Sequence, residues 1–219
     1  MKRILYLTGT RADFGKLKPL IKESKCKYDV SIFTTGMHML EKYGMTCHEI
    51  SKAGFEYYPF INQDSNPPMD RVLRNTIDGL SYYVQEHPID LLVVHGDRVE
   101  ALAGACVGAL NNILVAHIEG GEVSGAIDES IRHAVSKLSH IHFVANEEAA
   151  NRLRRMGEYN IFVIGSPDID IMLGKLPSLE EVKEKYAIEF EHYAICIYHP
   201  VTTEQVDLSI FDIIQADKE

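Results

Sequence analysis

The sequence has little cysteine, and what it has is scattered. The four cysteines form no C-x-x-C pair and stand far apart in the chain, at Cys26, Cys47, Cys106 and Cys196. This spacing argues against a zinc knuckle and against a disulfide framework, and it fits buried thiols in a reducing compartment. We therefore expect a cytoplasmic protein without a metal site.

Long apolar runs and positive charge are also scarce. No stretch approaches the roughly 18 apolar residues of a membrane helix, and the run after Lys2 and Arg3 is only as long as a strand, unlike a signal peptide. The formal net charge is −10, whereas nucleic-acid binding needs a basic face. We expect neither a nucleic-acid nor a membrane partner, and any anionic ligand must be held by local cations or helix N-termini.

Short apolar runs alternate with amphipathic segments over most of the chain. The runs are rich in β-branched residues and too short for helices, which is typical of buried parallel strands. They occupy residues 4–8, 30–34, 55–60, 91–94, 113–116, 140–144 and 161–164. Strands that alternate with helices predict an α/β fold with a doubly wound, Rossmann-like parallel sheet.

The pattern changes after the seventh run. A proline-containing connection at 174–178 leads to a charged helix at 179–186 and one more apolar run at 193–198. We expect a Rossmann-like first domain at 1–172, and a linker plus the first strand of a truncated second domain at 173–219. We also expect this chain alone to fold its first domain without completing a ligand cleft.

The turn after the first run lacks a dinucleotide fingerprint. A G-x-G-x-x-G motif beginning at Gly9 needs a second glycine where Arg11 stands, so we expect no nicotinamide cofactor. An arginine in a strand-to-helix turn suits a phosphate or a carboxylate, although a solvated loop arginine is an equal alternative. His38 follows the second run, where it is either a helix-start residue or a ligand contact.

Polar residues end the fourth and fifth runs abruptly. His95, Gly96, Asp97 and Arg98 follow the fourth run, and Glu119 follows the fifth. Ligands of open α/β sheets sit beyond the carboxyl ends of the strands, which makes both carboxylates candidates for chemistry. The alternative for Asp97 is that it caps the helix predicted after it.

The next helix begins with Asp128 and carries Arg132 one turn later. Such an i,i+4 pair is usually a surface ion pair, but here it follows a glycine loop and can equally face the crevice. His140 and His142 share one face of the sixth run. A metal site there lacks a third ligand at a recognisable spacing, so packing is the better interpretation.

Several long motifs, taken together and in order, resemble those of a known family. They are TGTRADFGKLKPL (8–20), TGMHM (35–39), HGDRVEALAG (95–104), HIEGGEVSGAIDESIRHAVSKLSHIH (117–142), IGSPDID (164–170) and YHPVTTE (198–204). The chain resembles the hydrolysing UDP-N-acetylglucosamine 2-epimerases of sialic-acid biosynthesis along nearly its whole length. It is also similar to the branch that acts on UDP-N,N′-diacetylbacillosamine in legionaminic-acid synthesis.

The resemblance implies the first half of a glycosyltransferase-B-like enzyme with its active site between two domains. The implied reaction removes the proton at carbon 2, eliminates UDP to give a 2-acetamidoglucal, and adds water to release N-acetylmannosamine. It needs no cofactor, and we expect a homo-oligomer that binds a UDP-sugar. By motif, Asp97, Glu119 and Asp128 are the acid/base carboxylates, Arg132 and His38 contact the sugar, and Arg11, Arg98 and His199 hold the diphosphate and uridine.

The implied chemistry suits these residue types. Elimination needs a base at carbon 2, while hydration needs a proton donor there and a base for water at carbon 1, which favours several carboxylates. Arginines and helix N-termini would stabilise the charge on departing UDP. We retain a second functional class as an alternative to an enzyme: a non-catalytic remnant that binds a sugar weakly or pairs with another chain.

Overall fold

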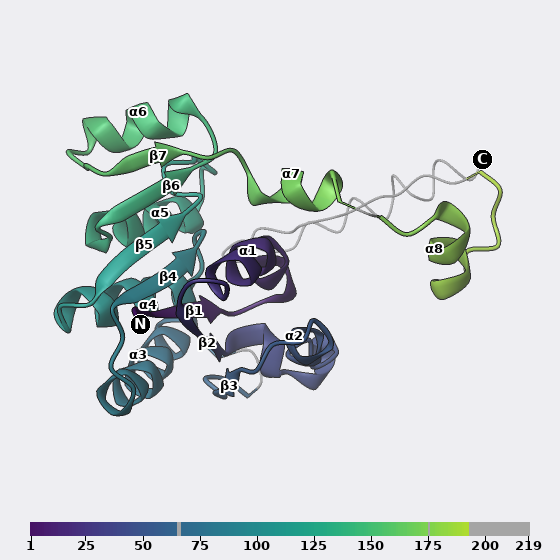
Figure 1. Cartoon of the computed structure of the whole chain (residues 1–219), viewed down its shortest axis with the longest axis horizontal. Helices are drawn as coiled ribbons and strands as arrows, with labels where there is room; N and C mark the ends of the chain where they lie inside the picture. Colours follow the sequence, from purple (N-terminus) through teal and green to yellow (C-terminus); the bar gives the residue numbers. More distant parts are fainter. Residues whose placement is uncertain (65–66, 175, 193–219) are drawn as a thin grey trace. The chain divides into compact units, whose positions relative to one another are not determined.

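The computed structural model describes residues 1–64, 67–174 and 176–192, and the chain divides into two compact units, Met1–Leu176 and Pro177–Glu219 (Figure 1). In the second unit the described part contains helix α8 (Leu179–Lys185), as the sequence predicts. Ser178 and Glu181 form a capping box at its start, with each side chain accepting a hydrogen bond from the other residue's backbone N–H.

The first unit contains a seven-stranded parallel sheet in the order β3-β2-β1-β4-β5-β6-β7 (Figure 1). The strands are β1 (Arg3–Thr8), β2 (Asp29–Thr34), β3 (Tyr58–Pro59), β4 (Leu91–His95), β5 (Leu114–Ile118), β6 (Ile141–Val144) and β7 (Ile161–Val163). The strand order reverses between β1 and β4. Their carboxyl ends therefore flank the switch point at which such sheets bind ligands.

The third strand is shorter than predicted. The sequence pattern suggests a strand at 55–60, but only Tyr58 and Pro59 pair, at the edge of the sheet. Pro59 has no N–H to donate, which confines it to an edge position. Phe55 instead packs edge-to-face on Phe14, with ring centroids 6.3 Å apart. The alternation of apolar residues in this run therefore reflects packing on a helix as much as sheet pairing.

Helices connect the strands. They are α1 (Arg11–Ser24), α2 (His48–Lys52), α3 (Met69–Glu86), α4 (Val99–Leu110), α5 (Ile127–Leu138), α6 (Glu147–Arg155) and α7 (Pro167–Met172), with two short 3₁₀ turns, Gly36–Met39 and Glu41–Tyr43, after β2. None of the helices in the described ranges is long and apolar enough to cross a membrane.

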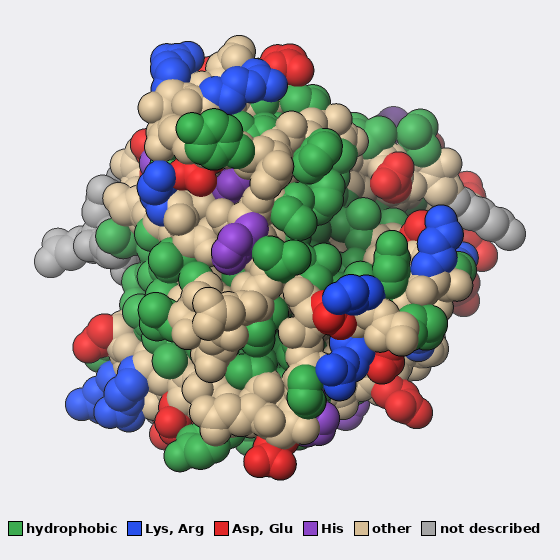
Figure 2. Space-filling view, turned by 60° about the vertical axis from the view of Figure 1, so that its left-hand side comes forward, with side chains coloured by type: hydrophobic (Ala, Val, Ile, Leu, Met, Phe, Trp, Pro, Cys, Tyr) green, Lys and Arg blue, Asp and Glu red, His purple; other side chains and the backbone are tan. Residues whose placement is uncertain are grey.

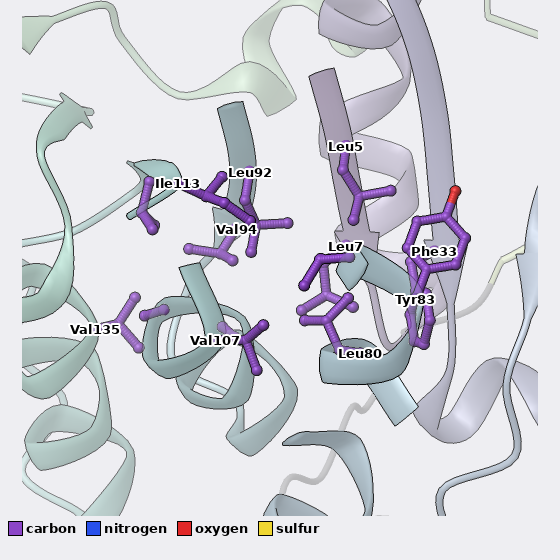
Figure 3. Close-up of a cluster of buried hydrophobic side chains, with 14 of the residues drawn as sticks. Leu5, Leu7, Phe33, Leu80, Tyr83, Leu92, Val94, Val107, Ile113 and Val135 are labelled. Carbon is purple, nitrogen blue, oxygen red and sulfur yellow. The ribbon is translucent and has the colours of Figure 1, made fainter. Parts of the chain in front are cut away.

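Apolar cores on both faces of the sheet confirm the doubly wound fold. Leu5 and Leu7 of β1 pack with Leu92 and Val94 of β4 under α3, α4 and α5, which Figure 3 shows in close-up. The alternate residues of β1, beginning with Ile4, pack on the other face with α1 and α2. Successive side chains of a strand point to opposite faces, so strands buried on both faces read as continuous apolar runs.

Helix α4 packs closely on the sheet through small residues. A Cβ atom at Gly104 would lie 2.7 Å from side-chain atoms of Leu7 and Val94, and one at Gly108 would lie 2.3 Å from Val115. This close packing fixes α4, and with it the residues that precede the helix. On the face shown in Figure 2, acidic and basic side chains are interspersed and form no basic patch.

Candidate active site

Glu119 lies at the centre of the candidate site, directly after β5. Its Oε2 accepts hydrogen bonds from Lys16 Nζ at 2.7 Å and His95 Nε2 at 2.9 Å, and its Oε1 accepts one from Ser166 Oγ at 2.7 Å. The side chain is only 14% exposed. Burial alone would raise the pKa of Glu119, but the hydrogen bonds from these three partners hold the pKa well below its usual range.

The backbone of Glu119 is also unusual. Its φ of +60° is in the left-handed region that residues other than glycine rarely adopt. Such conformations cluster at functional sites, where the surrounding structure holds them in place. Here the surrounding structure is the three side-chain contacts together with a hydrogen bond from Glu119 N to Phe143 O at 2.8 Å. The strand-end position predicted from sequence is therefore a strained and tightly held one.

His95, the last residue of β4, lies between two carboxylates. Its Nε2 contacts Glu119, and its Nδ1 lies 3.5 Å from Asp13 Oδ1. Burial would lower the pKa of His95, but Asp13 and Glu119 raise it to about 9. Asp13 is fixed in turn by Gly9 N, which donates to its Oδ2 at 3.1 Å. Burial would raise the pKa of Asp13, and its interactions with His95 lower it below the ordinary value.

Asp97 pairs with Arg132, so the pairing suggested by sequence spacing is wrong. The Arg132 guanidinium donates to Asp97 Oδ2 rather than to Asp128 one turn before it. Asp128 is half-buried and, within the described residues, has no hydrogen bond or ion pair of its side chain. Asp97 does not cap the following helix either. The N-cap residue of α4 is Arg98, and no side chain accepts a hydrogen bond from the first backbone N–H groups of this helix as a cap.

His117 holds the segments that carry Asp97 and Arg132. Its ring is fully buried on β5, with Nε2 donating to Gly96 O at 2.8 Å and Nδ1 lying 3.0 Å from Ser136 Oγ. Burial lowers the pKa of His117 to about 3, so the ring is neutral at physiological pH. A neutral ring that donates from Nε2 accepts at Nδ1. His117 therefore links the turn after β4 to α5.

The predicted arginine ligands differ in their surroundings. Arg11 is exposed at the start of α1, and no ion pair joins it to the described part of the chain. Arg98 is one-third exposed and donates from Nε to Glu100 Oε2 at 3.2 Å. Burial would lower the pKa of Arg98, but the charges of Glu100 and Asp13 raise it. Both arginines lie near a helix start at the carboxyl edge of the sheet, where an anion is favoured.

His38 is fully buried beneath the site. Its Nε2 lies 3.0 Å from Thr8 Oγ1 and its Nδ1 lies 2.9 Å from Thr46 Oγ1. Burial lowers the pKa of His38 to about 4, so the ring is neutral. Both ring nitrogens are thus already bonded to protein hydroxyls, and sugar contact by His38 stays a prediction. His199 lies outside the described residues.

Sequence reasoning did not assign a role at the site to four residues of the Glu119 environment. Asp13, Lys16, His95 and Ser166 surround Glu119, directly or through His95. His95 and Ser166 had a usable signal, because each lies where a predicted strand ends. Lys16 had none, since a lysine in the first turns of an amphipathic helix is ordinarily a solvated one. Among the described residues no group of three or more His, Cys, Asp or Glu is arranged to hold a metal ion; His142 instead lies 3.5 Å from Glu158.

Comparison with known proteins identifies the family. The model of the UDP-N-acetylglucosamine 2-epimerase family matches residues 21–218. A UDP-N-acetylglucosamine 2-epimerase of Neisseria meningitidis serogroup B is 55% identical over 210 residues, which cover 93% of this chain and 56% of that protein. A hydrolysing UDP-N,N′-diacetylbacillosamine 2-epimerase of Legionella pneumophila is 36% identical over 228 residues, which cover 99% and 60%.

The fold agrees. A Methanocaldococcus jannaschii UDP-GlcNAc 2-epimerase solved in complex with UDP-GlcNAc and UDP superposes with a TM-score of 0.69 and 26% identity, over 87% of this chain and 51% of that one. The predicted fold class, the Rossmann-like first half of a two-domain enzyme, is thereby confirmed. The chain spans little more than half the length of the curated relatives it matches. It belongs to the UDP-N-acetylglucosamine 2-epimerase family.

Proposed function

We propose that the full-length gene product is a hydrolysing 2-epimerase that converts UDP-N-acetylglucosamine and water to N-acetylmannosamine and UDP for sialic-acid synthesis. The observation that carries this proposal is that Asp97 and Glu119 follow two adjacent parallel strands at the carboxyl edge of the sheet, with Arg132 paired to Asp97, in a chain 55% identical to the meningococcal UDP-N-acetylglucosamine 2-epimerase. The explicitly hydrolysing Legionella relative supports the use of water as co-substrate.

The carboxylates differ in their fitness for proton transfer. Glu119 is held ionised by three donors, so it resists gaining a proton and is best suited to hold a fixed charge near the sugar. Proton transfer needs a group that gains and loses its proton during the reaction, and by motif Asp97 and Asp128 are the other two acid/base carboxylates. We therefore assign the removal and return of the proton at carbon 2 to Asp97, which pairs with Arg132, and to Asp128.

The leaving group needs positive charge. UDP departs with its diphosphate ionised, and groups aimed at the developing charge stabilise it most when they are already in place. Arg11 and Arg98 stand at the starts of α1 and α4 and supply such charge against a net charge of −10. We assign the uridine side to His199 and the sugar side to Arg132 and His38, following the family motifs.

A second candidate substrate is UDP-N,N′-diacetylbacillosamine, because the Legionella relative that acts on it matches 99% of this chain. The higher identity to the meningococcal protein favours UDP-N-acetylglucosamine. A cytoplasmic location and a homo-oligomeric state stay predictions, as does the alternative that the chain is a non-catalytic remnant.

The test is a coupled assay of UDP release by the full-length gene product with each nucleotide sugar in turn. We expect release from UDP-N-acetylglucosamine with N-acetylmannosamine as the sugar product. Faster release from the diacetylbacillosamine substrate would reassign the sugar. Formation of UDP-N-acetylmannosamine without free UDP would show a non-hydrolysing epimerase, and no reaction with either sugar would favour the remnant.

A further inference from the structure

His95 has two carboxylate neighbours, one on each side of its ring. Nε2 donates to Glu119 Oε2 at 2.9 Å, and Nδ1 lies 3.5 Å from Asp13 Oδ1. A neutral imidazole has one N–H, so it would present a lone pair to one of the two carboxylates. A protonated ring presents an N–H to both, and its Nδ1 then forms an ion pair with Asp13 that is not an aligned hydrogen bond. Two carboxylates on opposite sides of a ring that is only 8% exposed therefore favour the imidazolium form.

We propose that His95 is a positioning residue: clamped by Asp13, it holds the Glu119 carboxylate in the one orientation that the proposed epimerase reaction uses. This inference rests on the proposed function, because it assumes that Glu119 acts on the sugar. Nothing in the sequence motif alone distinguishes His95 from a buried packing histidine. The arrangement of three side chains from α1, β4 and the end of β5 does.

The other contacts of Glu119 show why the hydrogen bond from His95 matters for the orientation of its carboxylate. Ser166 holds Oε1, while Lys16 and His95 share Oε2. Lys16 also contacts Asp168 Oδ2 at 3.2 Å and is about a quarter exposed, so its position depends on the first turn of α7. His95 is buried and belongs to a central strand of the sheet. It is therefore the rigid part of the Glu119 environment.

The charged and titratable groups around His95 come from several elements. They are Asp13 and Lys16 from α1, Arg98 after β4, His117 from β5, and Glu119 itself. His117 is neutral because burial lowers its pKa to about 3. The two carboxylates raise the pKa of His95 to about 9 against the opposing effect of burial. The clamp is accordingly charged at neutral pH and is lost as the pH rises through about 9.

The first measurement needs no turnover. The ¹⁵N chemical shifts of the His95 ring in the 219-residue chain at pH 7.5 report its protonation directly. We expect both ring nitrogens to carry a proton in the wild type, and the Asp13→Asn variant to lose the second proton at a lower pH. A neutral His95 ring at pH 7.5 in the wild type would overturn the proposal.

The second measurement uses the full-length gene product and its pH–rate profile. His95→Gln keeps one N–H donor but carries no charge, so we expect kcat to fall about 10-fold to 100-fold, as is typical when a group that orients a catalytic ligand is lost, with little change in KM. Wild-type activity should fall as the pH rises through about 9, Asp13→Asn should move that fall to lower pH, and His95→Gln should lack it.

His142→Gln is the matched control. His142 is a buried histidine of β6 whose Nε2 lies 3.5 Å from Glu158 Oε2, away from the carboxyl edge. Equal losses in His95→Gln and His142→Gln, or an unmoved pH profile in Asp13→Asn, would reduce His95 to a structural residue and refute the proposal. If the wild type releases no UDP, the proposed function fails, and the ring shifts alone decide whether the clamp exists.

Discussion

The carboxylate of Asp97 is joined to the guanidinium of Arg132, which binds the turn after β4 to the second turn of α5. This pair leaves Asp128, four residues before Arg132, without a cation partner among the described residues. One carboxylate in the turn after β4 is thus bound to a fixed guanidinium, and a second one in the first turn of α5 is not. The proposed elimination and hydration need more than one acid/base group.

Replacing these carboxylates by amides should remove proton transfer while keeping shape. We expect Asp97→Asn and Asp128→Asn to lower kcat for UDP release by about 10²–10⁴-fold, the usual contribution of a general acid or base. The matched control is Asp78→Asn, on the exposed side of α3, which should retain normal turnover. Near-normal activity in both site variants would show that Asp97 and Asp128 are structural residues.

The turn after β2 should tolerate no side chain at Gly36. This glycine has φ +63°, and a Cβ atom would lie 2.5 Å from Glu100 Oε1 and 2.6 Å from Gly9 O. Gly36→Ala should cost about 3 kcal/mol, from backbone strain and overpacking together. Gly125 has φ +70° but open space around its Cβ position, so Gly125→Ala should cost only about 1 kcal/mol, the backbone term alone.

Urea unfolding of the 219-residue chain measures both free energies. The difference between the two variants isolates the steric contribution, since the left-handed backbone is common to them. Equal destabilisation would mean that both Glu100 and the Gly9 carbonyl move aside freely, and that the turns after β1 and β2 are not fixed against each other.

Acid should destabilise the fold through His38. Its pKa is lowered by burial to about 4, below the usual 6.5, so the unfolded state takes up the proton first. The stabilisation is fully present above pH 6.5 and is lost as the pH falls through about 4, and a shift of this size corresponds to about 3 kcal/mol. Thermal unfolding between pH 7 and pH 4 measures this loss.

A glutamine at position 38 does not titrate, so His38→Gln should reduce the slope of the stability curve between pH 6.5 and 4 and leave the share that His117 contributes. His48→Gln, at an exposed histidine of α2, is the control and should leave the curve unchanged. The same slope in all three proteins would assign the acid sensitivity to other groups, His117 first among them, because its pKa is lowered as well.

The sequence predicts the fold well because strands that are buried on both faces of the sheet consist of continuous apolar runs, which are easily recognised. It fails at β3, where Phe55 and Tyr57 are apolar because they pack on a helix-side core and not because they pair. It places Asp97 and Glu119 correctly at strand ends, since topology alone brings those ends together. The sequence does not predict the partner of Arg132. Helix spacing suggests Asp128, but the Arg132 side chain instead contacts Asp97, which follows the end of β4.

The contacts of Glu119 could not be predicted for a related reason. Lys16 is 103 residues away in the chain and Ser166 is 47 residues away, and neither belongs to a pattern that periodicity detects. Only the three-dimensional packing of α1 and α7 against the carboxyl edge brings them to one carboxylate. The left-handed backbone of Glu119 could not be predicted either, because glutamate rarely adopts a positive φ and nothing in the sequence indicates one here.

The most direct test of the central claim is solvent isotope incorporation. If the full-length gene product removes and returns the proton at carbon 2, then UDP-N-acetylglucosamine turned over in deuterated water should give N-acetylmannosamine with one deuterium at carbon 2, together with free UDP. Mass spectrometry and proton NMR of the sugar measure both. A 2-epimerised product that carries no deuterium at carbon 2 would contradict the elimination–hydration account and the roles assigned to Asp97 and Asp128.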